Sequence, residues 1–199
     1  YEAFKKKTSL VIVNKINKNL SLSKQIKVED THNFLTKCSS IFRENISTKI
    51  ISITGSCGKT TLKEMLGFVL KNISKVSYSP KSYNNKYGVP LSLINLKSDD
   101  DFGILEVGMD KKGEIDSLTR IIKPDLGIIT NISYAHSKNF RNIKQIAKAK
   151  AEIMNNIKEN GTIILNKDDN FYDFLKDIAV KKKLNVVSYG IKNKSAMIK

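Results

Sequence analysis

The sequence predicts an α/β fold in which helices cover both faces of a mostly parallel sheet, with a small α/β remnant in front of it. Short apolar runs alternate along the chain with longer segments of helical periodicity, which is typical of parallel sheets covered by helices. A glycine-rich turn at residues 54–61 joins one apolar run to a helix, so the fold is expected to contain a phosphate loop. The chain has 199 residues, of which 40% are hydrophobic and 27% are charged, a balance that suits a folded domain.

The first 45 residues are predicted to form the small remnant. Their expected elements are the end of a helix at 3–7, a strand at 9–13, a polar loop at 14–27 and a helix from Asp30 or Thr31 to about Asn45. This helix is expected because Phe34, Leu35 and Cys38 recur on one face. A domain boundary is expected near residues 46–49, where the amphipathic helix gives way to the first strand of the main sheet.

From residue 46 to residue 199 the pattern alternates regularly between strand and helix. The expected strands are 50–54, 76–79, 102–107, 126–130, 162–165 and 185–188. The expected helices are 59–71, 89–96, 114–122, 143–157 and 170–180. Ligands of parallel sheets bind at the carboxyl ends of the strands, and the chemical motifs described next follow strands.

The turn after the first of these strands carries the strongest motif. Its residues are Thr54, Gly55, Ser56, Cys57, Gly58, Lys59, Thr60 and Thr61. The glycines let backbone N–H groups wrap around phosphate oxygens, and the helix N-terminus adds a positive dipole. We expect Lys59 to reach the β- and γ-phosphates of a nucleotide and Thr60 to place its hydroxyl on Mg²⁺. Ile53 stands where the strict phosphate-loop pattern has a further glycine, and Cys57 is interpreted as a tolerated small residue rather than a nucleophile.

Further candidate residues follow later strands. Glu106 ends one strand, where a carboxylate beside a phosphate loop is a candidate Mg²⁺ ligand. Asn131 and His136 follow the next strand, and Lys150 lies on the helix after it. Taken singly, Glu106 fits the cap of a strand, His136 a loop histidine, and Lys148 and Lys150 a solvated helix face. Their shared location near strand ends favours a common site.

Composition limits the other function classes. Lys and Arg number 35 against 19 Asp and Glu, which gives a formal net charge of +16, but only three of the 35 are arginine and the lysines are spread along the whole chain. We interpret this excess as solvated lysine, which also attracts anionic substrates, and we expect no nucleic-acid partner. The two cysteines, Cys38 and Cys57, form no disulfide or metal pattern, and no apolar run is long enough to span a membrane.

Together these motifs closely resemble the Mur ligases, a family of ATP-dependent enzymes that form amide bonds in peptidoglycan synthesis. The resemblance rests on residues 53–63, 82–93, 106–109, 130–136 and 147–153, and it is strong over residues 46–199 and weak over residues 1–45. Within the family, the pair Asn84 and Asn85 before Gly-Val-Pro, and the Glu-Val-Gly-Met segment, resemble the members that add D-alanyl-D-alanine.

The resemblance implies a mechanism. ATP phosphorylates the terminal carboxylate of a UDP-N-acetylmuramoyl tripeptide, the amine of D-Ala-D-Ala attacks the acyl phosphate, and phosphate leaves. The implied roles are triphosphate binding for residues 55–61, charge neutralisation for Lys59, one Mg²⁺ on Thr60 and Glu106, a second Mg²⁺ near Glu106, His136 and Lys150, and cleft lining for Asn131 and for Asn84 or Asn85. The equivalent lysine is carbamylated in the family, which implies a carbamylated Lys150.

The resemblance also implies a domain organisation. Residues 1–45 resemble the end of an N-terminal UDP-substrate-binding domain, and residues 46–199 resemble a truncated central ATP-binding domain, and we expect no counterpart of the family's C-terminal domain in these 199 residues. We therefore expect this chain to fold and bind ATP but to be a poor ligase by itself, and we expect a monomer in the bacterial cytoplasm. Three alternatives stay open: a sister Mur-type ligase or folylpolyglutamate synthase, a nucleotide-binding module without catalysis, and a basic nucleic-acid-binding domain.

Overall fold

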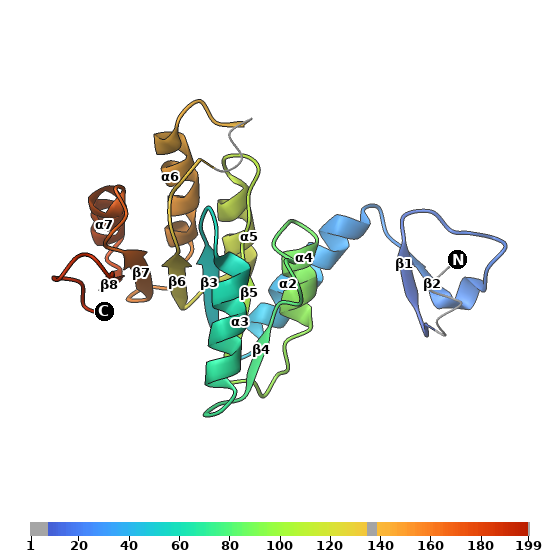
Figure 1. Ribbon diagram of the computed structural model, residues 1–199. Helices are drawn as coiled ribbons and strands as arrows, with labels where there is room; N and C mark the ends of the chain where they lie inside the picture. The colour runs from blue at the N-terminus through green and yellow to red at the C-terminus, as the bar shows by residue number, and fades with distance from the viewer. Residues whose placement is uncertain (1–7, 135–138, 199) are drawn as a thin grey trace. The chain divides into compact units, whose positions relative to one another are not determined.

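The structure, a computed structural model, describes residues 8–134 and 139–198, and it divides into two compact units at Cys38 and Ser39. Figure 1 shows the elements of both units in chain order. The expected helix end at residues 3–7 lies outside the described residues. In the described part of the chain, no helix is both long enough and apolar enough to cross a membrane.

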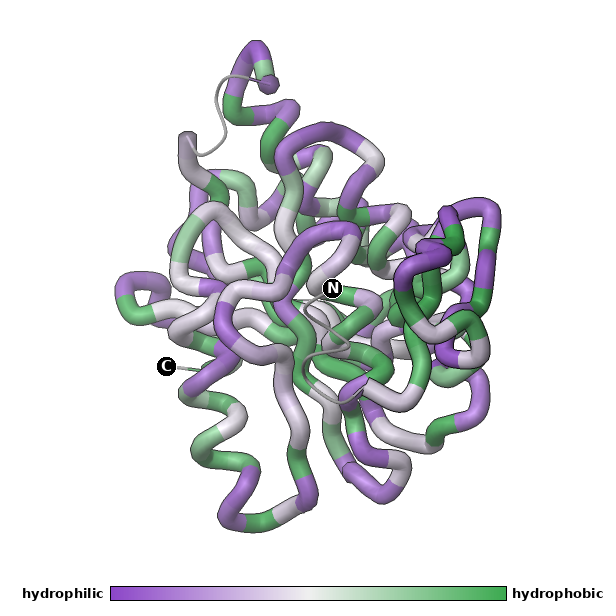
Figure 2. The backbone as a smooth tube through the Cα atoms, turned by 90° about the vertical axis from the view of Figure 1, so that its right-hand side faces the viewer, coloured by the Kyte–Doolittle hydropathy of each residue, from purple (hydrophilic) through white to green (hydrophobic). Residues whose placement is uncertain are grey.

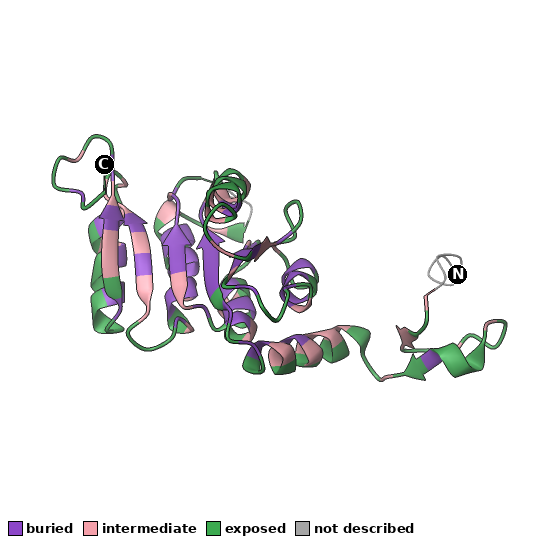
Figure 3. Ribbon diagram, turned by 90° about the horizontal axis from the view of Figure 1, so that it is seen from below, coloured by how far each residue is buried: buried purple, intermediate pink, exposed green. Residues whose placement is uncertain are grey.

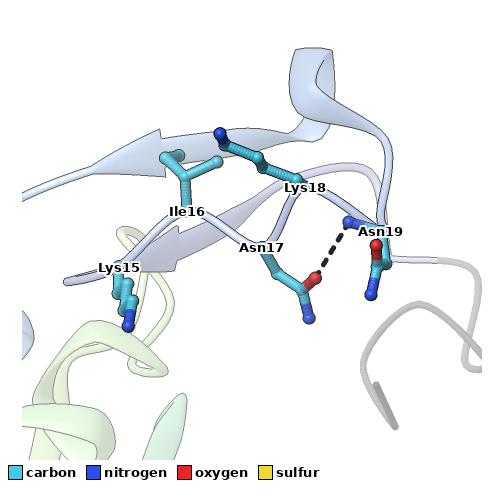
Figure 4. A pocket seen from close by; sticks show the side chains of 5 residues that line it. All are labelled: Lys15, Ile16, Asn17, Lys18 and Asn19. Atoms are coloured by element: carbon cyan, nitrogen blue, oxygen red, sulfur yellow. Dashed lines mark hydrogen bonds between the residues drawn. The ribbon is translucent and has the colours of Figure 1, made fainter.

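The first unit contains a two-stranded parallel sheet. Strand β1 (Val11–Val13) pairs with β2 (Gln25–Lys27), and the short 3-10 helix η1 (Leu22–Lys24) precedes β2. The prediction of a loop over residues 14–27 is therefore wrong for its last six residues. The buried Gln25 side chain donates to the backbone oxygens of Asn17 and Ser21 at 3.0 and 3.2 Å. Polar side-chain hydrogen bonds therefore hold this segment, and the sequence shows no apolar periodicity there. Figure 4 shows a surface pocket of the unit, lined by Lys15–Asn19, in which the Asn19 N–H donates to the Asn17 side chain.

Helix α2 (Thr31–Glu44) begins where the sequence predicts. The Asp30 carboxylate accepts the Asn33 N–H at 2.7 Å and so caps its first turn. Its second half belongs to the larger unit, because the Ser39 hydroxyl donates to Pro90 O and the buried Arg43 guanidinium donates to Ile122 O and to the Asp125 carboxylate. The compact units thus divide earlier than residues 46–49, and the assignment of residues 1–45 to a substrate-binding domain stays a prediction.

The larger unit is built on a six-stranded, all-parallel sheet with the order β4-β5-β3-β6-β7-β8. Its strands are β3 (Lys49–Thr54), β4 (Val76–Tyr78), β5 (Phe102–Glu106), β6 (Leu126–Ile129), β7 (Thr162–Asn166) and β8 (Asn185–Tyr189). Its helices are α3 (Lys59–Leu70), α4 (Gly88–Ile94), α5 (Glu114–Ile122), α6 (Ile143–Ala151), η3 (Glu152–Asn155) and α7 (Tyr172–Lys181). Figure 2 shows how hydrophobic and hydrophilic stretches alternate along the chain.

Helices cover both faces of this sheet, as the sequence predicts. Alternate residues of β3 point to opposite faces: Ile51 and Ile53 join the apolar cluster under α3, whereas Ile50 joins the larger cluster under α4, α5, α6 and α7. The central strand β3 is almost wholly buried, and the edge strand β8 is less so (Figure 3). The larger cluster holds most of the core and makes the sheet a rigid support for the loops at its carboxyl edge.

Several helix boundaries differ from the expected ones, and the structure shows the cause at two of them. The helix expected over residues 143–157 ends as α6 at Ala151 and tightens into η3, and such 3-10 turns are common at helix C-termini. The Glu152 carboxylate reaches the N-terminus of α5 there, where it accepts the Gly113 N–H at 2.8 and 2.9 Å. Burial raises the pKa of Glu152 above its ordinary value.

Helix α7 begins two residues later than expected, because Asp169 caps the preceding turn by accepting the Phe171 N–H.

Candidate active site

The candidate site lies at the carboxyl ends of three neighbouring strands. Strand β3 leads into the phosphate loop, β5 ends at Glu106 and β6 leads to Thr130 and Asn131. These strands are adjacent in the order β5-β3-β6, so the sheet brings together segments that are far apart in the sequence. A parallel sheet binds its ligands at this edge.

The two glycines of the phosphate loop are needed for different reasons. Gly58 caps α3 with φ +79°, a backbone conformation that side-chain-bearing residues rarely adopt. Gly55 passes so close to Thr130 that a Cβ atom would lie 1.8 Å from the Thr130 hydroxyl oxygen. The Lys59 ammonium folds back to donate to Gly55 O at 3.0 Å. The loop and the first turn of α3 therefore direct N–H groups and one cation toward the same edge of the sheet.

The segment after β6 supports the phosphate loop. The Ser56 N–H donates to Asn131 O at 2.9 Å, and the Cys57 N–H donates to the Asn131 side-chain oxygen at 3.2 Å. The Thr130 hydroxyl donates to Cys57 O at 2.7 Å. Asn131 therefore lies at the loop, where the sequence places it, and contacts its backbone. The Cys57 thiol is exposed.

Glu106 is buried at the centre of the site, with 1% of its surface exposed. The Thr60 hydroxyl donates to one of its carboxylate oxygens at 2.7 Å, and the Asn84 amide donates to the other at 2.7 Å. The Asn85 side chain turns elsewhere and accepts the N–H groups of Tyr87 and Gly88 at the start of α4. Of the two asparagines that the sequence could not separate, Asn84 thus contacts the acid.

Lys150 is 2% exposed, whereas Lys148 on the same helix is exposed. Burial, together with the nearby Lys59 cation, lowers the pKa of Lys150 from 10.5 to about 7. Within residues 8–134 and 139–198, no hydrogen bond or ion pair holds its ammonium group. The interpretation as a solvated helix face therefore fits Lys148 and fails for Lys150.

The remaining predicted ligand, His136, lies outside the described residues. Among the residues that are described, no three His, Cys, Asp or Glu side chains come together as a metal site. The oxygen ligands that the structure does bring together are the carboxylate of Glu106 and the hydroxyl of Thr60. Such a small set suits Mg²⁺, which is commonly held by one or two protein oxygens with phosphate and water oxygens completing the octahedron.

The structure adds residues that sequence reasoning did not single out. The Ser82 hydroxyl lies 3.1 Å from the Thr60 hydroxyl, and Lys63 is fully buried one helical turn after Thr60. Tyr189 on β8 donates to Thr130 O at 2.7 Å, and the Asp169 carboxylate accepts the Ile132 N–H at 2.7 Å. Ser82 and Lys63 stand in recognisable motifs, but only their position in three dimensions separates them from their neighbours.

Comparison with known proteins confirms the family resemblance. The model of the Mur ligase middle domain matches residues 53–199. The UDP-N-acetylmuramoyl-tripeptide–D-alanyl-D-alanine ligase of Buchnera aphidicola (Acyrthosiphon pisum) is 36% identical over 196 residues, which are 98% of this chain and 42% of that protein. The corresponding ligase of Rickettsia prowazekii is 36% identical over 98% of this chain and 44% of its own length. This chain thus spans less than half the length of these relatives.

Solved structures give the same picture. A crystal structure of MurF from Acinetobacter baumannii superimposes with a TM-score of 0.83 at 32% identity, over 93% of this chain and 40% of that one. The structure of MurF ligase from Thermotoga maritima in complex with ADP gives 0.80 at 29% identity, over 96% of this chain and 44% of that one. A diaminopimelate ligase at 16% identity and Escherichia coli FolC at 17% share the fold alone.

Proposed function

Because this chain belongs to the Mur ligase family, we propose that it is the ATP-binding part of a ligase that adds D-Ala-D-Ala to a UDP-N-acetylmuramoyl tripeptide. The observation that supports this most directly is the 2.7 Å contact between Thr60 of the phosphate loop and the buried Glu106. It sets a carboxylate beside the place where a nucleotide's phosphates meet the helix N-terminus. We place this activity in the bacterial cytoplasm, where ATP and UDP-linked precursors occur together.

The phosphate loop would bind the triphosphate through its backbone. The N–H groups at the start of α3 face the sheet edge, and the helix dipole favours negative charge there. Lys59 would exchange its bond to Gly55 O for the β- and γ-phosphates, where it neutralises charge that develops during transfer. Asn131 would keep the loop in shape through its contact with the Cys57 backbone.

The same residues fit a magnesium ion. Thr60 and Glu106 would hold it together with phosphate oxygens, and their two oxygen atoms already lie 2.7 Å apart. Bound there, Mg²⁺ supplies positive charge that stabilises the phosphoryl group in transfer. For a second ion we keep Glu106, His136 and Lys150 as the proposed ligands.

Lys150 can become a metal ligand only by losing its positive charge. With a pKa of about 7, a substantial fraction of its side chain is a neutral amine at physiological pH. Such an amine adds to the carbon of CO₂, forming an N–C bond and releasing one proton, and the product is an anionic carbamate with two oxygen ligands. We therefore propose that Lys150 is carbamylated, and isotope-labelled bicarbonate would reveal a carbamate carbon that Lys150→Ala abolishes.

The proposed reaction has two steps. The terminal carboxylate of the tripeptide attacks the γ-phosphorus of ATP, the bond to ADP breaks, and an acyl phosphate forms. The amine of D-Ala-D-Ala then attacks the acyl carbon, the amide bond forms, and phosphate leaves as the amine loses a proton. The chain's own groups contribute positioning and charge, which is the main source of catalysis in phosphoryl transfer.

The test is amine-dependent phosphate release by the protein that carries this chain. MgATP and the UDP-linked tripeptide are supplied, and D-Ala-D-Ala, D-Glu, lysine and diaminopimelate are offered one at a time. We expect stimulation by D-Ala-D-Ala alone and its loss in Lys59→Ala, whereas Lys71→Ala, an exposed lysine just after α3, serves as the control. Stimulation by another amine would indicate a sister ligase, and ATP binding without phosphate release would indicate a non-catalytic module.

A further inference from the structure

Lys63 is a buried charged residue that the proposed reaction does not use. It lies on α3, one turn after Thr60, and its side chain is fully buried. Lysine is almost never fully buried unless its charge is paired, so such a site needs an explanation.

The Lys63 ammonium has three donors, and three acceptors surround it. It donates to Ser79 O at 2.6 Å and to Lys81 O, and it forms an ion pair with the Glu64 carboxylate at 3.1 Å. Two of these acceptors are backbone carbonyls of the segment that follows β4. With these three contacts, the Lys63 ammonium holds a piece of backbone and is engaged within the protein.

The segment that Lys63 holds, residues 79–84, carries both side chains that contact the Thr60–Glu106 pair. Ser82 lies 3.1 Å from the Thr60 hydroxyl, and Asn84 donates to Glu106 at 2.7 Å. Lys81 within it has φ +48°, a conformation that costs a non-glycine residue about 1–2 kcal/mol and persists only when neighbours enforce it. The bond from Lys63 to Lys81 O fixes the segment at this strained residue.

We propose that Lys63 is a positioning residue that sets Ser82 and Asn84 against Thr60 and Glu106, and thereby fixes the geometry of the metal-binding pair. Because Lys63 and Thr60 lie on the same helix, the phosphate loop and the segment 79–84 are held to one support. The proposal deepens the proposed function and rests on it for the identity of the ion.

Hydrogen exchange tests the proposal without any ligand. The Gly108 N–H donates to Asn84 O at 2.7 Å, so its protection reports whether Asn84 is in place. We expect Lys63→Met to reduce amide protection at Gly108 and through residues 82–85 at least roughly tenfold beyond its effect on β3. Lys71→Met, the matched control just after the same helix, should leave these amides unchanged. Wild-type protection at Gly108 in a folded Lys63→Met protein would overturn the proposal.

Magnesium dependence gives a second readout. In wild-type protein ATP should bind more tightly with Mg²⁺ than with a chelator, and we expect Lys63→Met to reduce this ratio about tenfold while Mg²⁺-free ATP binding changes less than twofold. Asn84→Ala should lower the ratio similarly and should add nothing in the Lys63→Met background. Equal weakening of both affinities, or additive effects, would overturn the positioning role.

The outcomes separate the two proposals. A wild-type protein that binds ATP equally well with and without Mg²⁺ contradicts the proposed function, while the exchange experiment still decides the role of Lys63. If Lys63→Met does not fold, Lys63→Gln, which keeps two donors on a shorter side chain, takes its place in both measurements. Unfolding of Lys63→Gln as well would assign Lys63 to global stability and overturn the proposal.

Discussion

Two buried lysines flank the candidate site, and their surroundings are opposite. Lys63 on α3 donates to two backbone carbonyls and forms an ion pair with the Glu64 carboxylate. Lys150 on α6 is nearly as deeply buried, yet no residue in the described part of the chain accepts a bond from it. Its burial lowers its pKa, and the cation of Lys59 lowers it further. Their burial is alike, and their hydrogen bonding separates them.

The difference shows how one residue type serves two purposes. A buried cation whose donors are satisfied supports the fold, because its removal leaves the acceptors without a hydrogen-bond donor. A buried cation without acceptors is unstable as a cation, so its proton is easily lost and its nitrogen becomes reactive. The predictions below test this contrast, from the largest expected effect to the smallest.

The largest effect is expected from removing the reactive lysine. Lys150→Ala should lower D-Ala-D-Ala-dependent phosphate release at least about a thousandfold, or about 4 kcal/mol of transition-state stabilisation, because the proposed metal ligand is lost. Steady-state phosphate release measures this, and Lys148→Ala on the exposed face of the same helix should change the rate less than twofold. A loss below tenfold in Lys150→Ala would contradict the proposed role.

The next prediction concerns stability, and its sign differs between the two lysines. Lys63→Met should lower the free energy of unfolding by about 3 kcal/mol, because one buried and one partly buried carbonyl oxygen lose their donor. Lys150→Met should raise it by about 2 kcal/mol in CO₂-free buffer at pH 7, because an apolar chain replaces a desolvated ammonium. Urea unfolding followed by circular dichroism measures both, and changes of the same sign would break the contrast.

The pH dependence follows from the lowered pKa of Lys150. Between pH 7 and 10.5 the unfolded chain holds the Lys150 proton and the folded chain does not, so stability rises with pH over this window. The free-energy cost of burying the charged Lys150 ammonium is fully present below pH 7 and is relieved as the pH approaches 10.5. The free energy of unfolding of wild-type protein should therefore gain about 1 kcal/mol per pH unit relative to Lys150→Met, and parallel curves would contradict this.

The smallest effect is expected at the exposed acceptor of Lys63. The Glu64 side chain is 48% exposed, and exposed ion pairs contribute little. Glu64→Gln should therefore change the free energy of unfolding by less than about 0.5 kcal/mol and leave Gly108 protection unchanged. A larger loss would mean that the ion pair, rather than the two carbonyl bonds, holds Lys63.

Much of the fold could be predicted because the core strands are continuous apolar runs and the helices are periodic. The prediction missed the short strand β2 because hydrogen bonds of the Gln25 side chain hold it, and such bonds leave no recognisable pattern in a polar segment. Helix α6 ends before the predicted residue 157 because the chain tightens into η3. Apolar periodicity does not distinguish an α-helical turn from a 3-10 turn.

The candidate site could be predicted as far as its motifs reach. The phosphate loop and Glu106 are visible because glycine spacing and strand ends have local signatures. The choice of Asn84 over Asn85, and of Lys150 over Lys148, depends on which side of a turn or helix faces the sheet. The burial of Lys63 depends on the path of the segment 79–81, and the residues around Lys63 in the sequence give no information about that path.

The position of β3 in the sheet affects how the protein folds while the ribosome synthesises it. Within its sheet Lys49 pairs with Phe102 of β5, and Ile51 pairs with Leu126 of β6, so both neighbours of this most buried strand are made more than fifty residues after it. At roughly 5–20 residues per second, the apolar run 50–53 waits several seconds for its first partner. During that interval the strand that will carry the phosphate loop is an unpaired apolar segment, so a chaperone that shields nascent apolar strands should have its strongest effect here.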